Sequence, residues 1–231
     1  MRTAILDSVA RATPRTRRLR LTLAGGAFPF RAGQAVVAGL AGAATRAPYS
    51  IASPPSLGMA GALELLVPAD GAFGQAGLDP ATLTGATLEV EGPIGGFGVP
   101  DAAGAGPLLL VAGGTGISPI RSVILDRLDQ PGCSPATLVY SVRATDDFAF
   151  ADELAALAGD GRLVLHPTIT RDDGPADQPT RLGRVDAALL RAALPNRRAW
   201  CLVCGPAGFV ETVTATLEEL GVPPEHIVVE R

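Results

Sequence analysis

A glycine-rich turn between an apolar segment and a helical pattern is the stretch of this chain best suited to binding a phosphate. Leu108–Val111 is a continuous apolar run of the length of a buried strand, and the turn Gly113–Gly116 (GGTG) follows it. From Ile117 onward, isoleucines recur at helical spacing. Glycines let the backbone approach a ligand closely, and the helix they open offers free N–H groups and the positive end of its dipole. The pattern predicts a seat for a dinucleotide pyrophosphate; the alternative is a βα turn that binds nothing.

This glycine turn differs from two other phosphate loops. Pro119 stands where G-x-G-x-x-G would have its third glycine. A Walker P-loop is excluded because it needs a lysine, and all 19 basic residues of the chain are arginine.

A second stretch, Arg46–Ser50 (RAPYS), places a cation, an aromatic ring and a hydroxyl close together. On a strand these groups could hold a phosphate, a flat ring and a hydrogen-bond acceptor, in that order. The alternative is an ordinary strand whose Tyr49 packs in a core.

Composition excludes several classes of protein. The chain has 231 residues, of which 47% are hydrophobic and 18% charged, so a core is available and global disorder is not expected. The net charge of −4 argues against a general nucleic-acid binder. No uncharged apolar run reaches the roughly 18 residues of a membrane span, and no secretory signal pattern opens the chain. We therefore expect a cytoplasmic protein that binds neither nucleic acid nor membrane.

The three cysteines, Cys133, Cys201 and Cys204, are too few for a disulfide framework. Cys201-x-x-Cys204 suggests a redox or zinc site. However, Ala199–Val203 has the pattern of a strand, on which positions three apart point to opposite faces. No second pair of ligands exists elsewhere, so no metal site is predicted.

The first hundred residues show β patterns. Arg18–Leu23 alternates strictly between polar and apolar residues. The further predicted strands are Thr3–Val9, Ala35–Leu40, Tyr49–Ser53, Leu63–Val67 and Thr87–Glu91, with one helical turn around Gly77–Leu83. Gly and Pro separate the strands, as at Gly92-Pro93, and the spacing predicts a six-stranded antiparallel barrel.

A cluster of arginines lies near the N-terminus of the chain: Arg11, Arg15, Arg17, Arg18 and Arg20. This cluster is either a solvated strand face or a dock for an acidic electron carrier.

After the turn-rich segment Pro100–Pro107 the pattern changes to alternating strands and helices. The predicted strands are Leu108–Val111, Thr137–Ser141, Leu163–Ile169, Ala199–Val203 and His226–Val229. The predicted helices are Pro119–Leu128, Phe150–Ala156, Val185–Ala193 and Gly208–Leu220, and the polar segment Arg171–Arg181 is a loop. Such alternation predicts a parallel sheet with ligands beyond the carboxyl ends of its strands. We thus expect a barrel domain over residues 1–100, a linker over 101–107 and an α/β domain over 108–231.

In this order and spacing, the motifs resemble those of the ferredoxin–NADP reductase-like superfamily. A barrel with an arginine shortly before Tyr-Ser, a GGTG-I-x-P turn and a Cys-Gly-Pro turn at Cys204–Pro206 are typical of it. Gly92–Phe97 also matches its G-P-x-G-x-F turn. More narrowly, the chain resembles bacterial NAD(P)H reductases and oxygenase reductase components that lack an iron–sulfur domain. The resemblance covers essentially the whole chain.

The resemblance implies FAD on the barrel and NAD(P)H as substrate. Tyr49 would stack on the flavin ring, Ser50 would bond near its N5 atom, and Arg46 would face the phosphates. Cys204 and Glu230 would complete the nicotinamide site. The implied catalytic residues are Tyr49, Ser50, Cys204 and Glu230. The implied cofactor-binding residues are Arg46, Pro48, Tyr49, Ser50, Ile51, Gly71, Phe73, Gly74, Gly114, Thr115, Gly116, Pro119, Arg143, Arg171, Cys204, Gly205 and Pro206.

Two of the arginines bear on the choice of nucleotide. In the family, an arginine at the place of Arg143, with another near Arg171, is common in enzymes that bind the 2′-phosphate of NADPH. NADH enzymes also carry the first arginine, so the pair leaves the preference open, with a lean toward NADPH.

Three features depart from the family pattern. Two residues, instead of one, separate Arg46 from Tyr49, and Gly74 stands where a hydroxyl residue is usual. Arg46 would reach the flavin phosphates from a shifted position or not at all, and at Gly74 only backbone N–H groups remain, so both changes leave open how tightly flavin binds. The chain also ends in Glu230-Arg231 instead of an aromatic residue that would cover the flavin.

The implied function is hydride transfer from NAD(P)H to FAD, with electrons passed to a separate acceptor such as a ferredoxin, a flavodoxin or an oxygenase component. The acceptor is separate because the chain has no C-x4-C-x2-C run for an iron–sulfur cluster. One alternative is a reductase that uses free flavin as substrate; another is a non-catalytic flavin or nucleotide-binding module. A hydrolase with Ser118 as nucleophile is disfavoured because no G-x-S-x-G elbow surrounds it.

Overall fold

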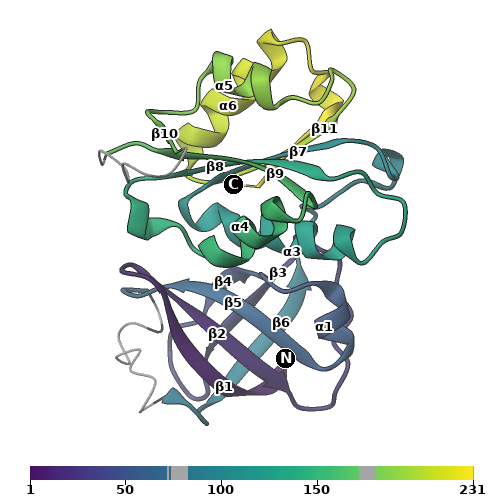
Figure 1. Ribbon diagram of the computed structural model, residues 1–231. Helices are drawn as coiled ribbons and strands as arrows, with labels where there is room; N and C mark the ends of the chain where they lie inside the picture. The colour runs from purple at the N-terminus through teal and green to yellow at the C-terminus, as the bar shows by residue number, and fades with distance from the viewer. Residues whose placement is uncertain (72, 74–82, 172–179, 231) are drawn as a thin grey trace.

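The computed structural model describes residues 1–71, 73, 83–171 and 180–230. Within these residues the chain forms two six-stranded sheets, one antiparallel and one parallel, which lie one below the other in Figure 1. The antiparallel sheet comes from the N-terminal part of the chain and the parallel sheet from the C-terminal part. The predicted two-domain fold class is confirmed.

The antiparallel sheet has the strand order β4-β3-β6-β1-β2-β5. Its strands are β1 (Arg2–Thr13), β2 (Thr16–Leu23), β3 (Ala35–Leu40), β4 (Ala47–Ser50), β5 (Ala62–Pro68) and β6 (Thr87–Ile94). Alternation along β2 buries Leu19, Leu21 and Leu23 in the sheet's inner face. Beyond the end of β4, Ile51 bridges to Leu65 on β5. Because β4 and β5 are the two edge strands, this bridge closes the sheet into a barrel.

One local prediction for the barrel was wrong. Gly92-Pro93 does not end the sixth strand, because β6 runs through it to Ile94. The ladder between β3 and β6 shifts register between Ala35 and Val37, opposite Gly92 and Pro93. A proline is tolerated at such a bulge because the ladder is already interrupted there.

A helix was not predicted between β4 and β5. The short helix α1 (Pro55–Met59) lies there, with a proline in its first turn, where a missing N–H costs nothing. The predicted helical turn Gly77–Leu83 lies outside the described residues except for Leu83.

The parallel sheet has the order β10-β9-β8-β7-β11-β12. Its strands are β7 (Leu108–Gly113), β8 (Ala136–Val142), β9 (Leu163–Ile169), β10 (Arg181–Leu182), β11 (Trp200–Cys204) and β12 (Ile227–Glu230). Its helices are α3 (Ile117–Leu128), α4 (Ala151–Gly159), α5 (Ala187–Ala193) and α6 (Ala207–Glu219). The short β10 was not predicted. It begins at Arg181, the last residue of the polar segment that was expected to be a loop, and residues 172–179 of that segment lie outside the described residues. No apolar run marks a strand of this length.

Helices cover both faces of the parallel sheet. Figure 1 shows α3 and α4 between this sheet and the barrel, and α5 and α6 on the far face. Each face has its own apolar core, and the core under α3 and α4 also includes Leu66 of the barrel. The two domains therefore share packed side chains. The chain between Ile94 and Leu108, which contains a turn at Asp101–Ala103, connects them.

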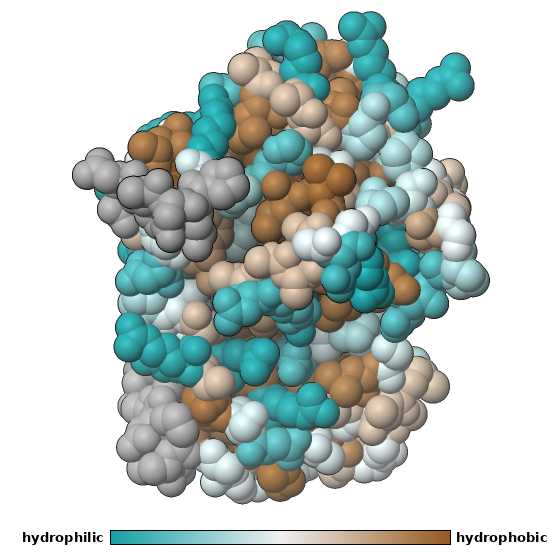
Figure 2. Space-filling view, in the orientation of Figure 1, coloured by the Kyte–Doolittle hydropathy of each residue, from teal (hydrophilic) through white to brown (hydrophobic). Residues whose placement is uncertain are grey.

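Among the described residues, the exposed large apolar side chains are few and come from separate parts of the chain. In the face shown by Figure 2, hydrophobic patches are small and separated by hydrophilic side chains. No helix among the described residues is long and apolar enough to cross a membrane.

The centre of the parallel sheet should dominate the stability of the α/β domain. Leu110 on β7 is fully buried between the neighbouring strands β8 and β11. We expect Leu110→Ala to lower the free energy of unfolding by about 2–5 kcal/mol, because the cavity cannot collapse between two paired strands. Urea unfolding measures this. Leu182→Ala, at a 54% exposed position, should change it by less than about 0.5 kcal/mol; equal losses would contradict the assignment of the core.

Candidate functional site

The glycine turn lies at the carboxyl edge of the parallel sheet, directly after β7. Gly114 has φ +56°, in the left-handed region that favours glycine. A Cβ atom on Gly116 would overlap the carbonyl of Cys204. The turn can therefore pack directly against the end of β11 only with glycine at this position. The helix α3 begins directly after this turn, so its free N–H groups lie where a phosphate could bind.

On the barrel side, Tyr49 and Ser50 are the last two residues of β4. Tyr49 is 8% exposed, and its ring packs against Phe73 with centroids 5.5 Å apart. A cavity of about 320 Å³ adjoins both residues. Its lining residues come from both domains and are Ala47, Pro48, Tyr49, Ser50, Leu66, Pro68, Gly71, Thr115 and Ser118. The flavin residues and the glycine turn predicted from sequence thus share one hollow.

Three of the four predicted catalytic side chains meet at the edge of this hollow. Ser50 Oγ donates to Glu230 Oε1 at 3.3 Å, and Cys204 Sγ donates to Glu230 Oε2 at 3.3 Å. Cys204 and Glu230 are side by side because β11 and β12 pair in register there. Glu230 therefore joins the strand that carries Tyr49 to the strand that carries Cys204.

Burial perturbs the acids of this cluster. Burial raises the pKa of Glu230, although the hydrogen bonds from Cys204 and Ser50 oppose the shift. Burial, reinforced by the negative charge of Glu230, raises the pKa of the Cys204 thiol far above its usual value. Cys204 is thus a neutral thiol at physiological pH, which disfavours a role as nucleophile or metal ligand. Burial likewise raises the pKa of Cys201 to about 12, which argues against a redox role for the Cys201-x-x-Cys204 motif.

The cavity presents an unpaired polar atom that a bound cofactor could satisfy. Ser118, in the first turn of α3, is 3% exposed, and its hydroxyl has no hydrogen-bond partner among the residues that the structure describes. A buried hydroxyl without a partner is unfavourable, and its place beside Thr115 suits a ribose or phosphate oxygen. The residues present therefore fit a flavin and a nucleotide. Sequence reasoning considered Ser118 only as a nucleophile, although its position just after the glycine turn was the available signal.

The two predicted 2′-phosphate ligands lie together. Arg143 follows β8, Arg171 follows β9, and both are exposed. The Arg171 N–H donates to the Arg143 carbonyl at 2.9 Å. The backbone segments that carry the two arginines are thus adjacent at the carboxyl edge of the sheet.

Arg46 lies apart from the other predicted residues. Its guanidinium pairs with Glu89 at 3.8 Å and Glu91 at 3.7 Å on β6, and the residue is not part of the cavity lining. The extra residue between Arg46 and Tyr49 explains this. An arginine two positions before Tyr49 would lie on the same face of an extended chain as Tyr49, whereas Arg46, three positions before it, lies on the opposite face.

The remaining predicted cofactor-binding residues have different surroundings. Ile51 is fully buried in the barrel core, and Pro119 is buried in the first turn of α3. Pro206 precedes α6, next to Gly205. Gly74 lies outside the described residues.

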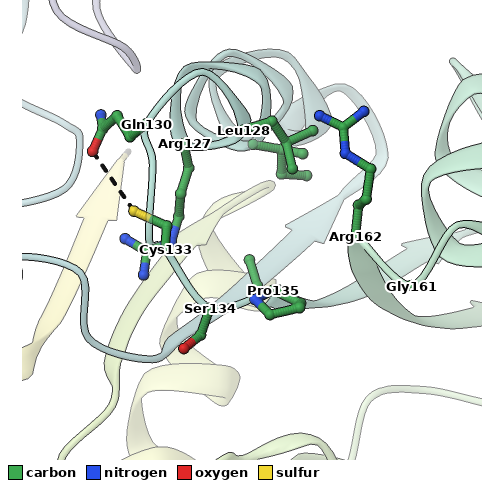
Figure 3. A pocket seen from close by; sticks show the side chains of 10 residues that line it. Arg127, Leu128, Gln130, Cys133, Ser134, Pro135, Gly161 and Arg162 are labelled. Carbon is green, nitrogen blue, oxygen red and sulfur yellow. Dashed lines mark hydrogen bonds between the residues drawn. The ribbon is translucent and has the colours of Figure 1, made fainter.

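A second cavity, of about 230 Å³, lies at the other end of the parallel sheet (Figure 3). The end of α3 and the residues just before β8 and β9 line it, among them Arg127, Cys133 and Arg162. Ligands of such sheets bind beyond the carboxyl ends of the strands, whereas this cavity adjoins the amino ends. We therefore assign the functional site to the cavity shared by the two domains.

These features define a two-domain oxidoreductase that binds a nucleotide on its α/β half, and comparisons with known proteins agree. The family model described as the oxidoreductase NAD-binding domain matches residues 110–215. Ferredoxin–NADP reductase B of Sorangium cellulosum is 34% identical, over 99% of this chain and 96% of that protein. The ferredoxin–NAD(P)(+) reductase component of the naphthalene 1,2-dioxygenase system of Pseudomonas putida is 30% identical over 62% of this chain, but the match spans only 43% of that protein. The crystal structure of an Amycolatopsis cytochrome P450 reductase superposes with a TM-score of 0.84 at 28% identity, over 100% of this chain and 69% of that one.

The chain belongs to the ferredoxin–NADP reductase-like superfamily. The predicted enzyme class, an NAD(P)H-dependent flavoprotein reductase, and the predicted cofactors, FAD with NAD(P)H, are confirmed by this membership. Its activity is NAD(P)H-dependent electron transfer.

The raised pKa of Glu230 predicts a pH-dependent cost to stability. A carboxyl whose folded-state pKa is raised binds more protons in the folded state, so its effect on stability becomes unfavourable as pH rises above the ordinary value of 4.5. We expect Glu230→Gln to melt at a higher temperature than the wild type at pH 7, and the gap to close as pH falls toward 4.5. Differential scanning calorimetry across this range measures the gap. The exposed Glu225→Gln serves as control and should show no gap; a wild type more stable than Glu230→Gln at pH 7 would refute the assignment.

Proposed function

We propose that this chain takes hydride from NAD(P)H onto FAD held by the barrel and passes the electrons to a separate acceptor protein. The observation that carries the proposal is the Ser50–Glu230–Cys204 contact, which crosses the domain interface beside the shared cavity. When bound, the nicotinamide supplies a hydride and the flavin accepts it and releases electrons one or two at a time. The residues of this chain bind, orient and exchange protons around those groups.

Tyr49 and the glycine turn would bind the two cofactors from opposite sides of the cavity. Tyr49 is supported from behind by Phe73, so its ring offers a fixed flat surface for stacking. The glycine turn and the N–H groups of α3 would hold the pyrophosphate, and Ser118 would donate its free hydroxyl. Cys204, as an uncharged thiol, can contact a nicotinamide ring without the cost of a buried charge.

Ser50 and Glu230 would handle the proton. The Ser50 hydroxyl faces the cavity from β4 and donates to the Glu230 carboxylate. Ser50 Oγ would accept a proton from the cavity side while it gives its own proton to the Glu230 carboxylate. The raised pKa of Glu230 brings it closer to the pH at which such exchange is efficient.

An acidic electron carrier is the acceptor that the surface favours. In the β1–β2 hairpin, Arg11, Arg18 and Arg20 are exposed, and Arg11 lies directly opposite Arg17 across the hairpin. Like charges facing each other across strands are unfavourable, and an acidic partner would relieve the repulsion and be steered by it. The match to a dioxygenase reductase component supports the same class of partner.

The second candidate function, a reductase of free flavin, is favoured by one observation. Arg46 pairs with Glu89 and Glu91 and not with the cavity, so one expected phosphate contact is missing. Gel filtration of the purified protein distinguishes the two functions. Flavin that elutes with the protein supports a prosthetic group, whereas complete loss of flavin supports free flavin as substrate.

Anaerobic reduction of the bound flavin tests the proposed function directly. We expect NADPH or NADH to bleach the visible flavin absorbance of the wild type. Ser50→Ala should slow steady-state turnover with an added electron acceptor by about 10²- to 10⁴-fold, the range of a lost acid–base group, with the nucleotide KM little changed. Ser8→Ala, at an exposed barrel position, is the control and should match the wild type. Failure of both nucleotides to bleach the wild type would refute the reductase function.

The adjacent Arg143 and Arg171 predict a difference in affinity between NADPH and NADH. We expect Arg143→Ala to raise the KM for NADPH at least tenfold and the KM for NADH less than about twofold, because only NADPH carries the 2′-phosphate that a guanidinium binds. Steady-state kinetics with both nucleotides measure the split. Arg162→Ala, at the opposite edge of the sheet, is the matched arginine control. An equal change for both nucleotides would show that Arg143 does not contact the 2′-phosphate.

A further inference from the structure

Arg121 ties the two domains together and has no part in the chemistry described above. It lies on α3 and is only 6% exposed. Its Nη1 atom donates to the Ala52 carbonyl at 2.8 Å and to Glu64 Oε2 at 2.9 Å, both on the barrel. Its Nε and Nη2 atoms donate to the Glu153 carboxylate on α4, at 3.1 and 2.8 Å. One buried guanidinium is therefore held by carboxylates of both domains.

Ser122, the next residue of α3, makes a second buried bond across the interface. Its hydroxyl donates to the Ser53 carbonyl at 2.7 Å. On the other side, the Ser53 hydroxyl accepts the Glu64 N–H at 3.0 Å, and the Ala52 N–H donates to the Glu64 carbonyl. Ala52 and Ser53 are thus hydrogen-bonded both to the α/β domain and to β5. We call these contacts of Arg121 and Ser122 the interdomain clamp.

A strained residue helps to fix the guanidinium. Phe150, just before α4, has φ 61°, a left-handed conformation that is unfavourable for a bulky residue. Its ring lies 4.3 Å from Arg121 Cζ, in cation–π geometry. This backbone conformation places the ring against Arg121, and the contact offsets part of the strain.

The clamp lies a few residues from both predicted cofactor sites. Along the barrel chain, Ala52 and Ser53 follow Ser50 by two and three residues. Along α3, Arg121 follows Gly116 by five residues, little more than one helical turn. Both paths are short and run through hydrogen-bonded backbone.

Among the described residues, the Ser50–Glu230 bond across the interface is part-buried and 3.3 Å long, and two further polar contacts between the domains are exposed. Arg15, at the tip of the β1–β2 hairpin, binds Asp147 with a side chain 54% exposed, and Ser56 donates to Asp129 at an exposed position. Exposed contacts of this kind contribute little and vary with solvent. The buried clamp is therefore the polar contact best able to fix the spacing of the domains.

We propose that Arg121, with Ser122, is a positioning residue that sets the distance between Ser50 and the glycine turn, and so between the flavin and the nicotinamide. The proposal rests on the proposed function. It predicts that loss of the clamp opens the interface and slows hydride transfer without weakening either cofactor site itself.

Thiol labelling tests the opening without any cofactor chemistry. Cys204 is buried at the interface beside Glu230, whereas Cys201, three residues earlier, lies inside the sheet. A maleimide reagent should label Cys204 whenever the interface opens, and Cys201 only when the domain unfolds. We expect Arg121→Gln to speed labelling of Cys204 at least tenfold, with Cys201 unchanged, as followed by peptide mass spectrometry.

Arg127 provides the matched control. It lies on the same helix, is 5% exposed, and donates to backbone carbonyls of Gly104 and Ala105 in the connection between the domains. Arg127→Gln therefore removes an equally buried arginine that does not reach the barrel. It should lower the melting temperature but leave the labelling rate of Cys204 unchanged.

Flavin reduction tests the consequence for the reaction. At saturating nucleotide, and normalised to bound flavin, Arg121→Gln should slow anaerobic bleaching at least tenfold, because displacement of about 1 Å can cost a hundredfold in rate. The nucleotide KM should stay within about twofold. Arg121→Lys, which keeps the cation, should restore part of the rate, and Arg127→Gln should match the wild type.

Each outcome decides the proposal. Unchanged Cys204 labelling in Arg121→Gln, or equal slowing by Arg127→Gln, overturns it. If both cysteines are labelled equally fast in Arg121→Gln, the variant has unfolded. The variant Ser122→Ala, which removes a single hydrogen bond, then decides. Faster labelling of Cys204 alone in Ser122→Ala supports the clamp, and no change overturns it. A wild type that NAD(P)H does not bleach refutes the proposed function, while labelling still tests the clamp.

Discussion

A hydride moves only between atoms that approach to about 3–3.5 Å, and in this protein the two atoms would be held by separately built sheets. Tyr49 and Ser50 belong to the barrel, whereas the glycine turn and Cys204 belong to the parallel sheet. Neither domain contains a complete site. The fixed spacing of the two domains is therefore the constraint on which the activity depends.

The interface meets this constraint with polar groups as well as apolar packing. Leu66 of the barrel joins the core beneath α3 and α4. Such apolar packing resists separation of the two domains but permits them to slide past each other. Hydrogen bonds are directional, so Glu230 and Arg121, which bond to both domains, also fix the register. Glu230 carries a cost, because its carboxylate is partly buried and its pKa is raised. A site that sacrifices stability for function is expected at an active centre.

Much of this arrangement could be predicted from the sequence. Alternation on β2 and the strand–glycine–helix pattern at Gly113–Gly116 predicted both sheets, because each depends on local periodicity. The order of the Tyr49-Ser50, Cys204 and Glu230 motifs suggested the candidate site residues, of which Ser50, Cys204 and Glu230 lie in contact. That Ser50, Cys204 and Glu230 meet depends on the pairing of β11 with β12 and on the domain interface, which no local pattern specifies.

Other features could not be found in this way. Arg121 appears in the sequence as one of three charged residues of α3, with Asp126 and Arg127, and its partners Glu64 and Glu153 lie far away along the chain. Arg46 was expected at the flavin phosphates, but one additional residue before Tyr49 is enough to turn a side chain to the other face of a strand. Such outcomes depend on register and long-range contacts, which sequence periodicity does not encode.

The most direct test of the central claim is a crystal structure of the protein with FAD and the oxidised nucleotide bound. The account predicts the flavin ring against Tyr49, its N5 atom within hydrogen-bond distance of Ser50 Oγ, and the nicotinamide beside Cys204 in the same cavity. A flavin bound elsewhere on the barrel, or a nucleotide whose nicotinamide cannot enter the cavity between the domains, would contradict it.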